Sequence, residues 1–172
     1  MRLSMAKHLK QAVSGIIFCS EKKKVLLIKR RDIPVWVLPG GGVEVQETPE
    51  EAVIREVHEE TGLSVKIVRK VAEYAPVNKL TQLTHLFECS IVQGNLQTGS
   101  ETKEIGFFLS SKLPLLPPPY LSWIQDTLSH QECVIQKKIE GVSYLILCKF
   151  LCLHPILVTR YLMTKIGIHI NT

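Results

Sequence analysis

Three glutamates lie close together in the middle of the chain, and their spacing could hold a metal ion. Glu56, Glu59 and Glu60 fall within about 100° of arc if they belong to one helix. Carboxylates this close would raise one another's pKa unless a cation lay between them. Because every candidate ligand is an oxygen, the cluster predicts magnesium or manganese rather than zinc. Magnesium commonly shares a substrate's phosphates, so we expect a phosphorylated substrate.

The residues around this cluster predict the helix that must position it. Thr48 is suited to be the N-cap, Pro49 the first helical residue, and Glu51 the residue that closes a capping box. Gly62 provides the C-terminal stop. We expect the helix to bury a neighbouring apolar face formed by Val53, Ile54 and Val57.

The order of these residues resembles the Nudix box of the MutT-like hydrolases. Gly41, five residues, Glu47, seven residues and then the run REVHEETGL from Arg55 to Leu63 agree with it at every specified position. A solvated acidic helix face is the alternative for a bare glutamate cluster. The resemblance implies an α/β/α sandwich with a mixed sheet, in which the box forms a loop, a helix and a loop. It also implies hydrolysis, at the pyrophosphate, of a nucleoside diphosphate linked to another group.

The resemblance assigns roles to individual residues of the box. Carried onto this sequence, it makes Glu59 and Glu60 metal ligands, joined by Glu56 and by a backbone carbonyl of Gly40 or Gly41. Arg55 is expected to orient a carboxylate, with Glu47 as its partner, because a guanidinium can pair with a carboxylate through two parallel bonds.

The general base stays open between two glutamates. Glu56 is the first candidate. Glu104 is the second, because it precedes the strand-like run IGFF at a place similar to one where some relatives supply a late glutamate. Its neighbour Glu101 could be mistaken for it, and either residue could be an ordinary surface carboxylate.

Two segments before the box are candidates for binding substrate. Arg30 and Arg31 follow an apolar strand, and their charges could meet phosphates or could lie at a solvated strand end. Gly40, Gly41 and Gly42 form a loop that allows close approach of backbone to a ligand, and Gly42 is expected to contact substrate.

The remaining pattern predicts an α/β fold in which strands surround the catalytic helix. Apolar or alternating runs predict strands at 12–19, 25–28, 34–38, 65–72, 83–92 and 105–109, the first two forming a hairpin. A proline-rich connector then leads to a second helix over 122–129, with Ser122 as its cap. We therefore expect a Nudix-type domain over residues 1–130.

Composition limits the classes of partner. The chain has 172 residues and a net charge of +5, which suits nucleotide-type anions but is too diffuse to predict nucleic-acid binding. Its five cysteines lack the close spacing of zinc or redox motifs, and residues 1–10 lack the apolar run of a signal peptide. We expect a cytoplasmic protein.

Residues 131–172 form an apolar and basic C-terminal extension, expected to be helical. Its apolar run, 142–163, contains Lys149, His154, Pro155 and Arg160, so a membrane span is not expected. Three interpretations stay open: a helical hairpin packed on the domain or on a second subunit of a homodimer, a peripheral membrane contact, and a disordered tail.

The substrate within the class is not fixed by the sequence. Pro76 lies close to, but off, the spacing expected for ADP-ribose hydrolases, so the subfamily stays undetermined. The compact domain, without a long N-terminal insertion, is most similar to general nucleotide hydrolases, which implies a (d)NTP, ADP-ribose or another sugar nucleotide as substrate. Two other functions stay open: a nucleotide-binding sensor without turnover, and a membrane-associated hydrolase of a lipid diphosphate.

Overall fold

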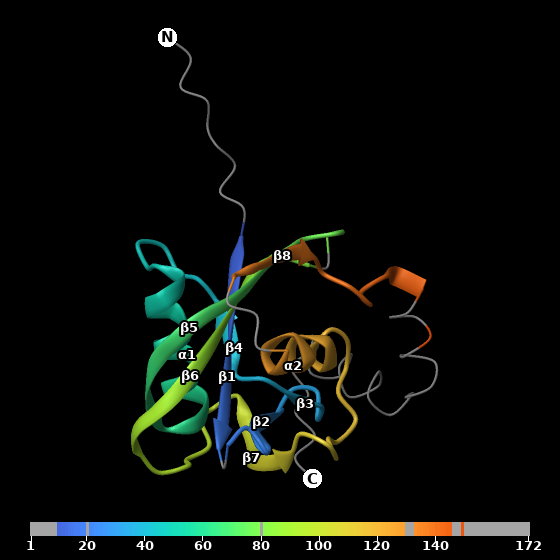
Figure 1. Ribbon diagram of the computed structural model, residues 1–172. Helices are drawn as coiled ribbons and strands as arrows, with labels where there is room; N and C mark the ends of the chain where they lie inside the picture. The colour runs from blue at the N-terminus through green and yellow to red at the C-terminus, as the bar shows by residue number, and fades with distance from the viewer. Residues whose placement is uncertain (1–9, 20, 80, 130–132, 146–148, 150–172) are drawn as a thin grey trace.

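The computed structural model describes residues 10–19, 21–79, 81–129, 133–145 and 149, which build two helices and a mixed sheet (Figure 1). The elements are β1 (Gln11–Cys19), β2 (Lys24–Arg30), β3 (Trp36–Val37), β4 (Gly40–Gly42), α1 (Pro49–Thr61), β5 (Leu63–Ala75), β6 (Leu83–Gly94), β7 (Thr102–Leu109), α2 (Tyr120–Leu128) and β8 (Ile135–Lys138).

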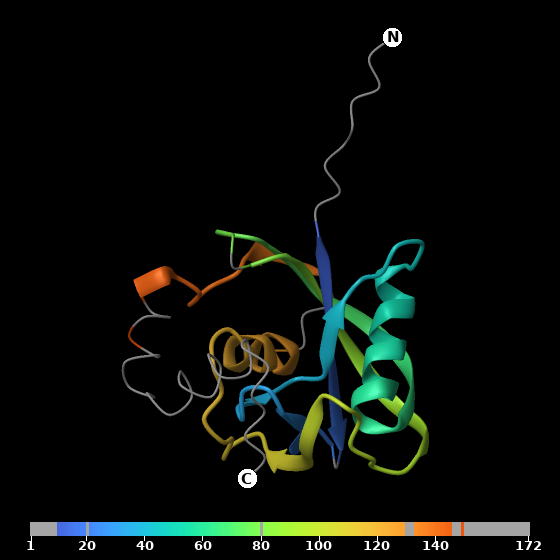
Figure 2. The ribbon, with the colours of Figure 1, turned by 180° about the vertical axis from the view of Figure 1, so that it is seen from behind.

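The sheet has the order β3-β2-β1-β6-β5-β8, with β4 pairing with β1 and β7 with β2. β1 runs antiparallel to β2, as expected for the predicted hairpin, and parallel to β6. α1 covers one face of the sheet and α2 the other, and the view from behind shows the same layers (Figure 2). The structure therefore confirms the α/β/α sandwich with a mixed sheet.

Alternation along the central strands explains the two layers. On β1, Ile16 belongs to the core beneath α2 and Ile17 to the core beneath α1; on β6, Leu86 and Phe87 divide in the same way. Successive side chains of a strand point to opposite faces, so apolar runs such as these are buried on both sides.

The first helix begins and ends where the sequence predicts. The Thr48 hydroxyl accepts a hydrogen bond from the Glu51 amide at 3.2 Å, and the Glu51 carboxylate accepts one from the Thr48 amide at 2.8 Å. Gly62 ends the helix with φ of 73°, in the left-handed region that glycine favours. These caps fix the angular position of every side chain on α1.

The buried face of α1 differs in part from the prediction. Val53 and Val57 are fully buried, as expected, and Ala52 joins them, whereas Ile54 is 39% exposed. Each residue advances about 100° around a helix, so a buried stripe through Val53 and Val57 turns Ile54 toward solvent. The same geometry turns Glu60 inward, where it is 6% exposed.

The second helix starts two residues earlier than predicted, at Tyr120. Pro119 occupies the N-cap position, and Ser122, the expected cap, instead donates its hydroxyl to the Pro119 carbonyl at 2.7 Å. Trp123 and Ile124 are buried against the sheet. The helix therefore starts at the end of the proline run, and its N-cap makes no side-chain hydrogen bond.

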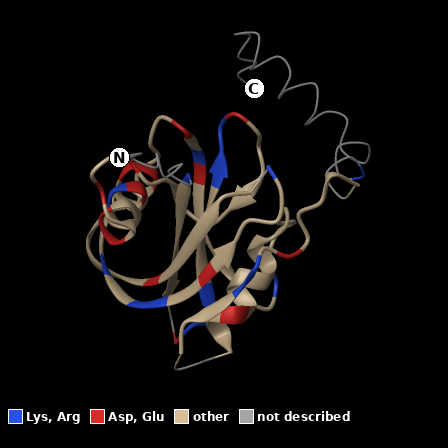
Figure 3. Cartoon of the chain, turned by 90° about the horizontal axis from the view of Figure 1, so that it is seen from above, with Lys and Arg blue, Asp and Glu red and all other residues tan. Residues whose placement is uncertain are grey.

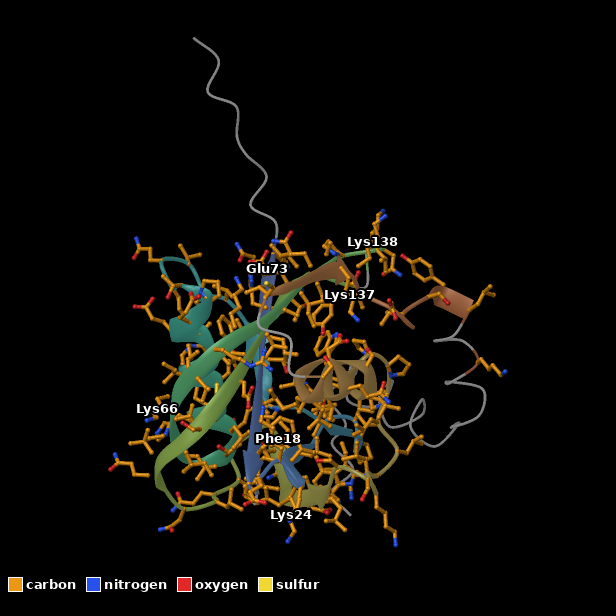
Figure 4. All side chains as sticks on the ribbon, viewed as in Figure 1. Phe18, Lys24, Lys66, Glu73, Lys137 and Lys138 are labelled. Carbon is orange, nitrogen blue, oxygen red and sulfur yellow. The ribbon has the colours of Figure 1, made fainter. Side chains whose placement is uncertain are left out.

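Two strands were not predicted. Gly40–Gly42, expected as a loop, form β4, which pairs with β1. β8 adds to the edge of the sheet in parallel with β5, with Ala72 opposite Ile135 and Ala75 opposite Lys138. Figure 4 shows Lys137 and Lys138 near Glu73 at that end of the sheet. The sheet thus continues past residue 130. Most of the apolar run 142–163, and with it the expected helical extension, lies outside the described residues.

Candidate active site

The carboxylates of α1 face a cavity of about 350 Å³ beside the glycine loop. Figure 3 shows acidic residues gathered on α1, at the left of the view. The acidic cavity, as we call it, is lined by Arg30, Gly40, Gly41, Gly42, Glu44, Arg55, Glu56, Glu59, Glu60, Ser100 and Glu101. Most of the predicted site residues therefore meet in one place.

Arg55 is the centre of a network of ion pairs on this wall. Its Nε and Nη2 donate to the two carboxylate oxygens of Glu47 at 2.8 and 2.9 Å, which is the expected pair. Its Nη1 donates to Glu56 at 2.9 Å and to Glu59 at 3.3 Å. The hydrogen bonds from Arg55 hold the pKa of Glu47 below its usual value. One fixed guanidinium thus orients three carboxylates.

The glycine loop lies against the glutamates on the other side. A Cβ atom at Gly41 would be 2.3 Å from Glu56 Oε1, so a larger residue would push Glu56 out of its contact with Arg55. The Gly40 amide donates to Glu60 Oε2 at 2.8 Å. The loop therefore helps to place two of the three clustered carboxylates.

Burial leaves Glu60 in an unusual electrostatic state. Loss of hydration raises its pKa to about 7, and the nearby Glu56 carboxylate adds to the increase; the Gly40 amide and Arg30 oppose it. Burial also raises the pKa of Glu56, against the lowering effect of Arg55. A second carboxylate beside a buried one is the arrangement that a cation would relieve.

The donors present fit a hard divalent cation. Within the described part of the chain, no three histidine, cysteine or acidic residues already stand as a ligand set. Instead, Arg55 donates hydrogen bonds to Glu56 and Glu59, and the Gly40 amide donates one to Glu60, so the three carboxylates are turned toward these donors. The available groups are carboxylate and carbonyl oxygens, the ligands that Mg²⁺ and Mn²⁺ prefer.

A second cavity of about 410 Å³ adjoins the acidic one. Arg30, Gly40, Gly41 and Gly42 line both cavities. The rest of the second cavity is lined by Ala12, Val13, Ser14, Leu38, Thr81, Gln82, Thr84, Pro118, Pro119, Tyr120, Trp123, Ile139 and Val142. A cavity of this size, lined by apolar side chains together with several polar groups, suits a small organic group.

Arg30 stands at the junction of the two cavities, as a substrate-binding residue should. Its Nε and Nη2 donate to the two carboxylate oxygens of Asp32 at 2.9 and 2.8 Å. That pair fixes the plane of the guanidinium. Sequence reasoning gave no role to Asp32.

Arg31 does not share this position. Its Nε donates to the Ser100 carbonyl at 3.0 Å and its Nη2 to the Thr102 carbonyl at 2.9 Å, and it lines neither cavity. Successive residues at the end of a strand point to opposite sides, so Arg30 and Arg31 cannot both face the junction. The expectation that Arg31 binds substrate is not supported.

Glu104 is also placed away from the carboxylate cluster. It lies opposite Lys29 in the β2–β7 register and accepts a hydrogen bond from Lys29 Nζ at 2.9 Å. Glu101, in the loop before β7, lines the acidic cavity instead. The structure therefore places Glu101, rather than the predicted Glu104, at the acidic cavity.

Comparison with known proteins agrees with the fold and the box. A family model described as the NUDIX domain matches residues 8–128. The chain belongs to the Nudix family. It is accordingly a hydrolase of phosphoric anhydride bonds, and enzymes of this family generally use divalent cations.

Several individual Nudix proteins are similar over most of the chain. A protein named ADP-ribose pyrophosphatase, from Methanocaldococcus jannaschii, is 38% identical over 125 residues, which are 69% of this chain and 73% of that protein. A putative 8-oxo-dGTP diphosphatase of Bacillus subtilis is 38% identical over 60% of this chain and 70% of its own length. The crystal structure of an ADP-ribose pyrophosphatase from Streptococcus suis covers 75% of this chain and 98% of its own, with a TM-score of 0.61 and 29% identity.

Several residues around the Nudix box were missed by sequence reasoning. Asp32 and the wall residues Thr81, Ile139 and Val142 belong to no motif and come together only through the fold. For Asp32 a signal did exist, since an acidic residue two positions after Arg30 at a strand end can form a local pair. The others carry no comparable pattern.

Proposed function

We propose that this protein is a pyrophosphohydrolase of nucleotides, dependent on Mg²⁺ or Mn²⁺, whose substrate is a (d)NTP or ADP-ribose or another sugar nucleotide. The observation that carries the proposal is the pair of adjoining cavities joined at Arg30 and the glycine loop. The acidic cavity suits a cation and a diphosphate, and the second cavity suits the organic group. Two relatives are named for 8-oxo-dGTP and ADP-ribose, which favours this range of substrates.

Arg30 is the residue that we expect to bind the diphosphate where the cavities meet. Asp32 occupies two of its donors, which leaves the Nη1 donors and one Nη2 donor for phosphate oxygens. The other arginine of the acidic cavity, Arg55, already donates to three carboxylates and to the Gly42 carbonyl. Arg30 thus contacts substrate, whereas Arg55 keeps the carboxylates in place.

Glu56, Glu59 and Glu60, with a carbonyl of Gly40 or Gly41, are the proposed ligands of the cation. When bound, a divalent cation neutralises phosphate charge and lowers the pKa of an attacking water. Gly42 provides the backbone against which the phosphates pack, because it has no side chain and lines both cavities.

The chemical step is attack of water on phosphorus. The new P–O bond forms as the bridging P–O bond of the anhydride breaks, and the water's proton passes to a carboxylate. Glu56 is the first candidate for that base, because its raised pKa makes it a better proton acceptor than an exposed glutamate. Glu101 replaces Glu104 as the second, because Glu101 lines the acidic cavity.

A substrate panel tests this proposal. Nucleoside triphosphates, 8-oxo-dGTP, ADP-ribose and sugar nucleotides are incubated with the purified chain and Mg²⁺ or Mn²⁺, and the products are identified by chromatography. We expect cleavage of one class at the pyrophosphate and none in EDTA. Absence of turnover on every diphosphate compound would refute the enzymatic proposal and leave the nucleotide-binding sensor.

Three properties outside the site stay predictions. We propose a cytoplasmic location, assembly as a homodimer, and an end of the Nudix family domain near residue 130, after which β8 continues the same sheet. Within the described residues, no helix has the length and apolar character to cross a membrane.

A further inference from the structure

The second cavity is completed by residues beyond the part of the chain that the family model matches. That match ends at residue 128, yet Ile139 and Val142 line the cavity. Ile139 is 6% exposed and belongs to the same core cluster as Trp123, and Val142 packs against that cluster. The segment after the family domain is therefore part of the cavity wall and of the core.

Backbone hydrogen bonds hold this segment in a defined position. β8 pairs with β5, and directly after it the Ile139 amide donates to the Ala75 carbonyl at 3.0 Å. The Asn78 side-chain amide donates to the Val142 carbonyl at 2.8 Å. Asn78 belongs to the loop that contributes Thr81 and Gln82 to the same cavity. Two walls that are distant in the sequence are thus tied together.

A half-buried polar cluster fixes β8 to α2 from the other side. The Tyr74 hydroxyl donates to Asp126 at 2.7 Å, and Lys137 Nζ donates to the same carboxylate at 2.8 Å. Tyr74 also stacks on Trp123, with ring centroids 5.0 Å apart. Since Trp123 lines the cavity, the positions of α2 and of residues 139–142 are coupled.

We propose that residues 139–142 select the organic group of the substrate. This wall places the apolar side chains of Ile139 and Val142 in the same cavity as the polar residues Thr81 and Gln82, a combination that suits the ring system of a nucleoside. The proposal rests on the proposed function for its substrates. It places specificity in a segment that the family domain does not include, so relatives with the same box can differ in substrate.

Substitutions that change the volume of this wall in opposite directions test the proposal. In the full-length chain, Val142→Phe should raise KM for the best nucleotide about tenfold. Val142→Ala should raise kcat/KM for substrates with bulkier organic groups, compared with kcat/KM for the best nucleotide. kcat should change by less than about threefold, because the acidic cavity is untouched. Val134→Phe is the matched control, since Val134 is 43% exposed and lines neither cavity.

A binding measurement separates this proposal from the proposed function. AMP, GMP, CMP and UMP lack the anhydride bond, and their dissociation constants can be measured by calorimetry whether or not the protein hydrolyses anything. The dissociation constant of the tightest-binding monophosphate should rise about tenfold in Val142→Phe but not in Val134→Phe. That result supports binding of the organic group by residues 139–142 even if no compound of the substrate panel is cleaved. An unchanged order of substrates and of monophosphate affinities in both Val142 variants, or no monophosphate binding to the wild-type chain, would overturn it.

Thermal unfolding of each variant shows whether the fold is kept. If Val142→Phe does not fold, Asn78→Asp is the second route, because an aspartate cannot donate to the Val142 carbonyl. That variant should weaken monophosphate binding by severalfold with little change in kcat. Asn78→Asp with wild-type binding and wild-type substrate order would contradict the proposal.

Discussion

The two adjoining cavities are built from different kinds of sequence. Apart from Arg30, Ser100 and Glu101, the acidic cavity comes from a single stretch, residues 40–60. The second cavity draws on β1, the loop before β6, the start of α2 and the segment after β8. A contiguous motif positions its own side chains through one helix, whereas a dispersed wall depends on the whole fold. We therefore expect that substitutions can change the chemistry and the substrate specificity of this protein separately.

Substitutions of the proposed metal ligands should have the largest effect on activity and should impair only the acidic cavity. Glu59→Gln and Glu60→Gln should each lower kcat by about 10²- to 10³-fold or more, the range seen when one preorganised electrostatic group is lost. Far-UV circular dichroism should be unchanged, because neither variant alters volume. Glu50→Gln on the exposed first turn of the same helix is the control and should keep activity. Magnesium-dependent turnover retained in Glu59→Gln would remove it from the ligand set.

Substitutions of Glu101 and Glu104 should have smaller effects on kcat and should show which of the two belongs to the acidic cavity. Glu101→Gln should reduce kcat about tenfold or more as a lost acid–base or cation-binding group, less than the roughly 10²- to 10⁴-fold typical of a primary general acid or base. Glu104→Gln should stay within about twofold of wild type, because it loses only an exposed pair with Lys29. Steady-state kinetics at several Mg²⁺ concentrations measures both. The reverse order of effects would restore Glu104 to the site.

The second cavity should respond through KM rather than kcat. Tyr120 lines it and contacts Trp123 edge to face, with ring centroids 5.4 Å apart. Tyr120→Ala should raise KM several-fold, as expected for an aromatic contact worth about 1 kcal/mol, while kcat changes little. Tyr144→Ala, in an exposed position that lines neither cavity, is the control. A fall in kcat with constant KM would mean that the two cavities are not separable.

The same contrast explains what could be predicted from the sequence. The capping box, the helix stop and the pairing of Arg55 with Glu47 were predictable because they are local: each depends on residues within one turn or two. The layers of the sandwich followed from the family resemblance. Strand β8 was not predicted because its four residues, two of them lysines, lack the alternation of apolar and polar residues that indicates a strand.

The wrong predictions for site residues also concern contacts between segments that are distant in the sequence. Glu101 and Glu104 are three residues apart, so only the β2–β7 register, which puts Lys29 opposite Glu104, decides which of them reaches the acidic cavity. Arg30 and Arg31 differ in the same way through strand alternation. Composition and spacing identify the charged groups, but pairing between distant strands decides where they point.

The pH dependence of stability tests whether the acidic cavity is built for a cation. The folded protein raises the pKa of Glu60 to about 7, against 4.5 for an unperturbed glutamate, so between these values the folded state binds more protons than the unfolded one. Stability therefore falls as pH rises from 5 to 8, by about 3 kcal/mol from this group. His85, whose burial lowers its pKa, acts in the opposite direction, so the comparison must be with Glu60→Gln.

Melting temperatures measured in EDTA should thus decline from pH 5 to 8 more steeply in the wild-type protein than in Glu60→Gln, by several degrees over the range. Millimolar Mg²⁺ should flatten the wild-type curve at pH 8 and leave the variant almost unchanged, because a bound cation stabilises the ionised carboxylate. Parallel curves for the two proteins in EDTA would mean that Glu60 is ionised without a cation. Arg30 and the Gly40 amide, the two groups that lower its pKa, would then be sufficient to hold its charge, and the acidic cavity would need no metal to be stable.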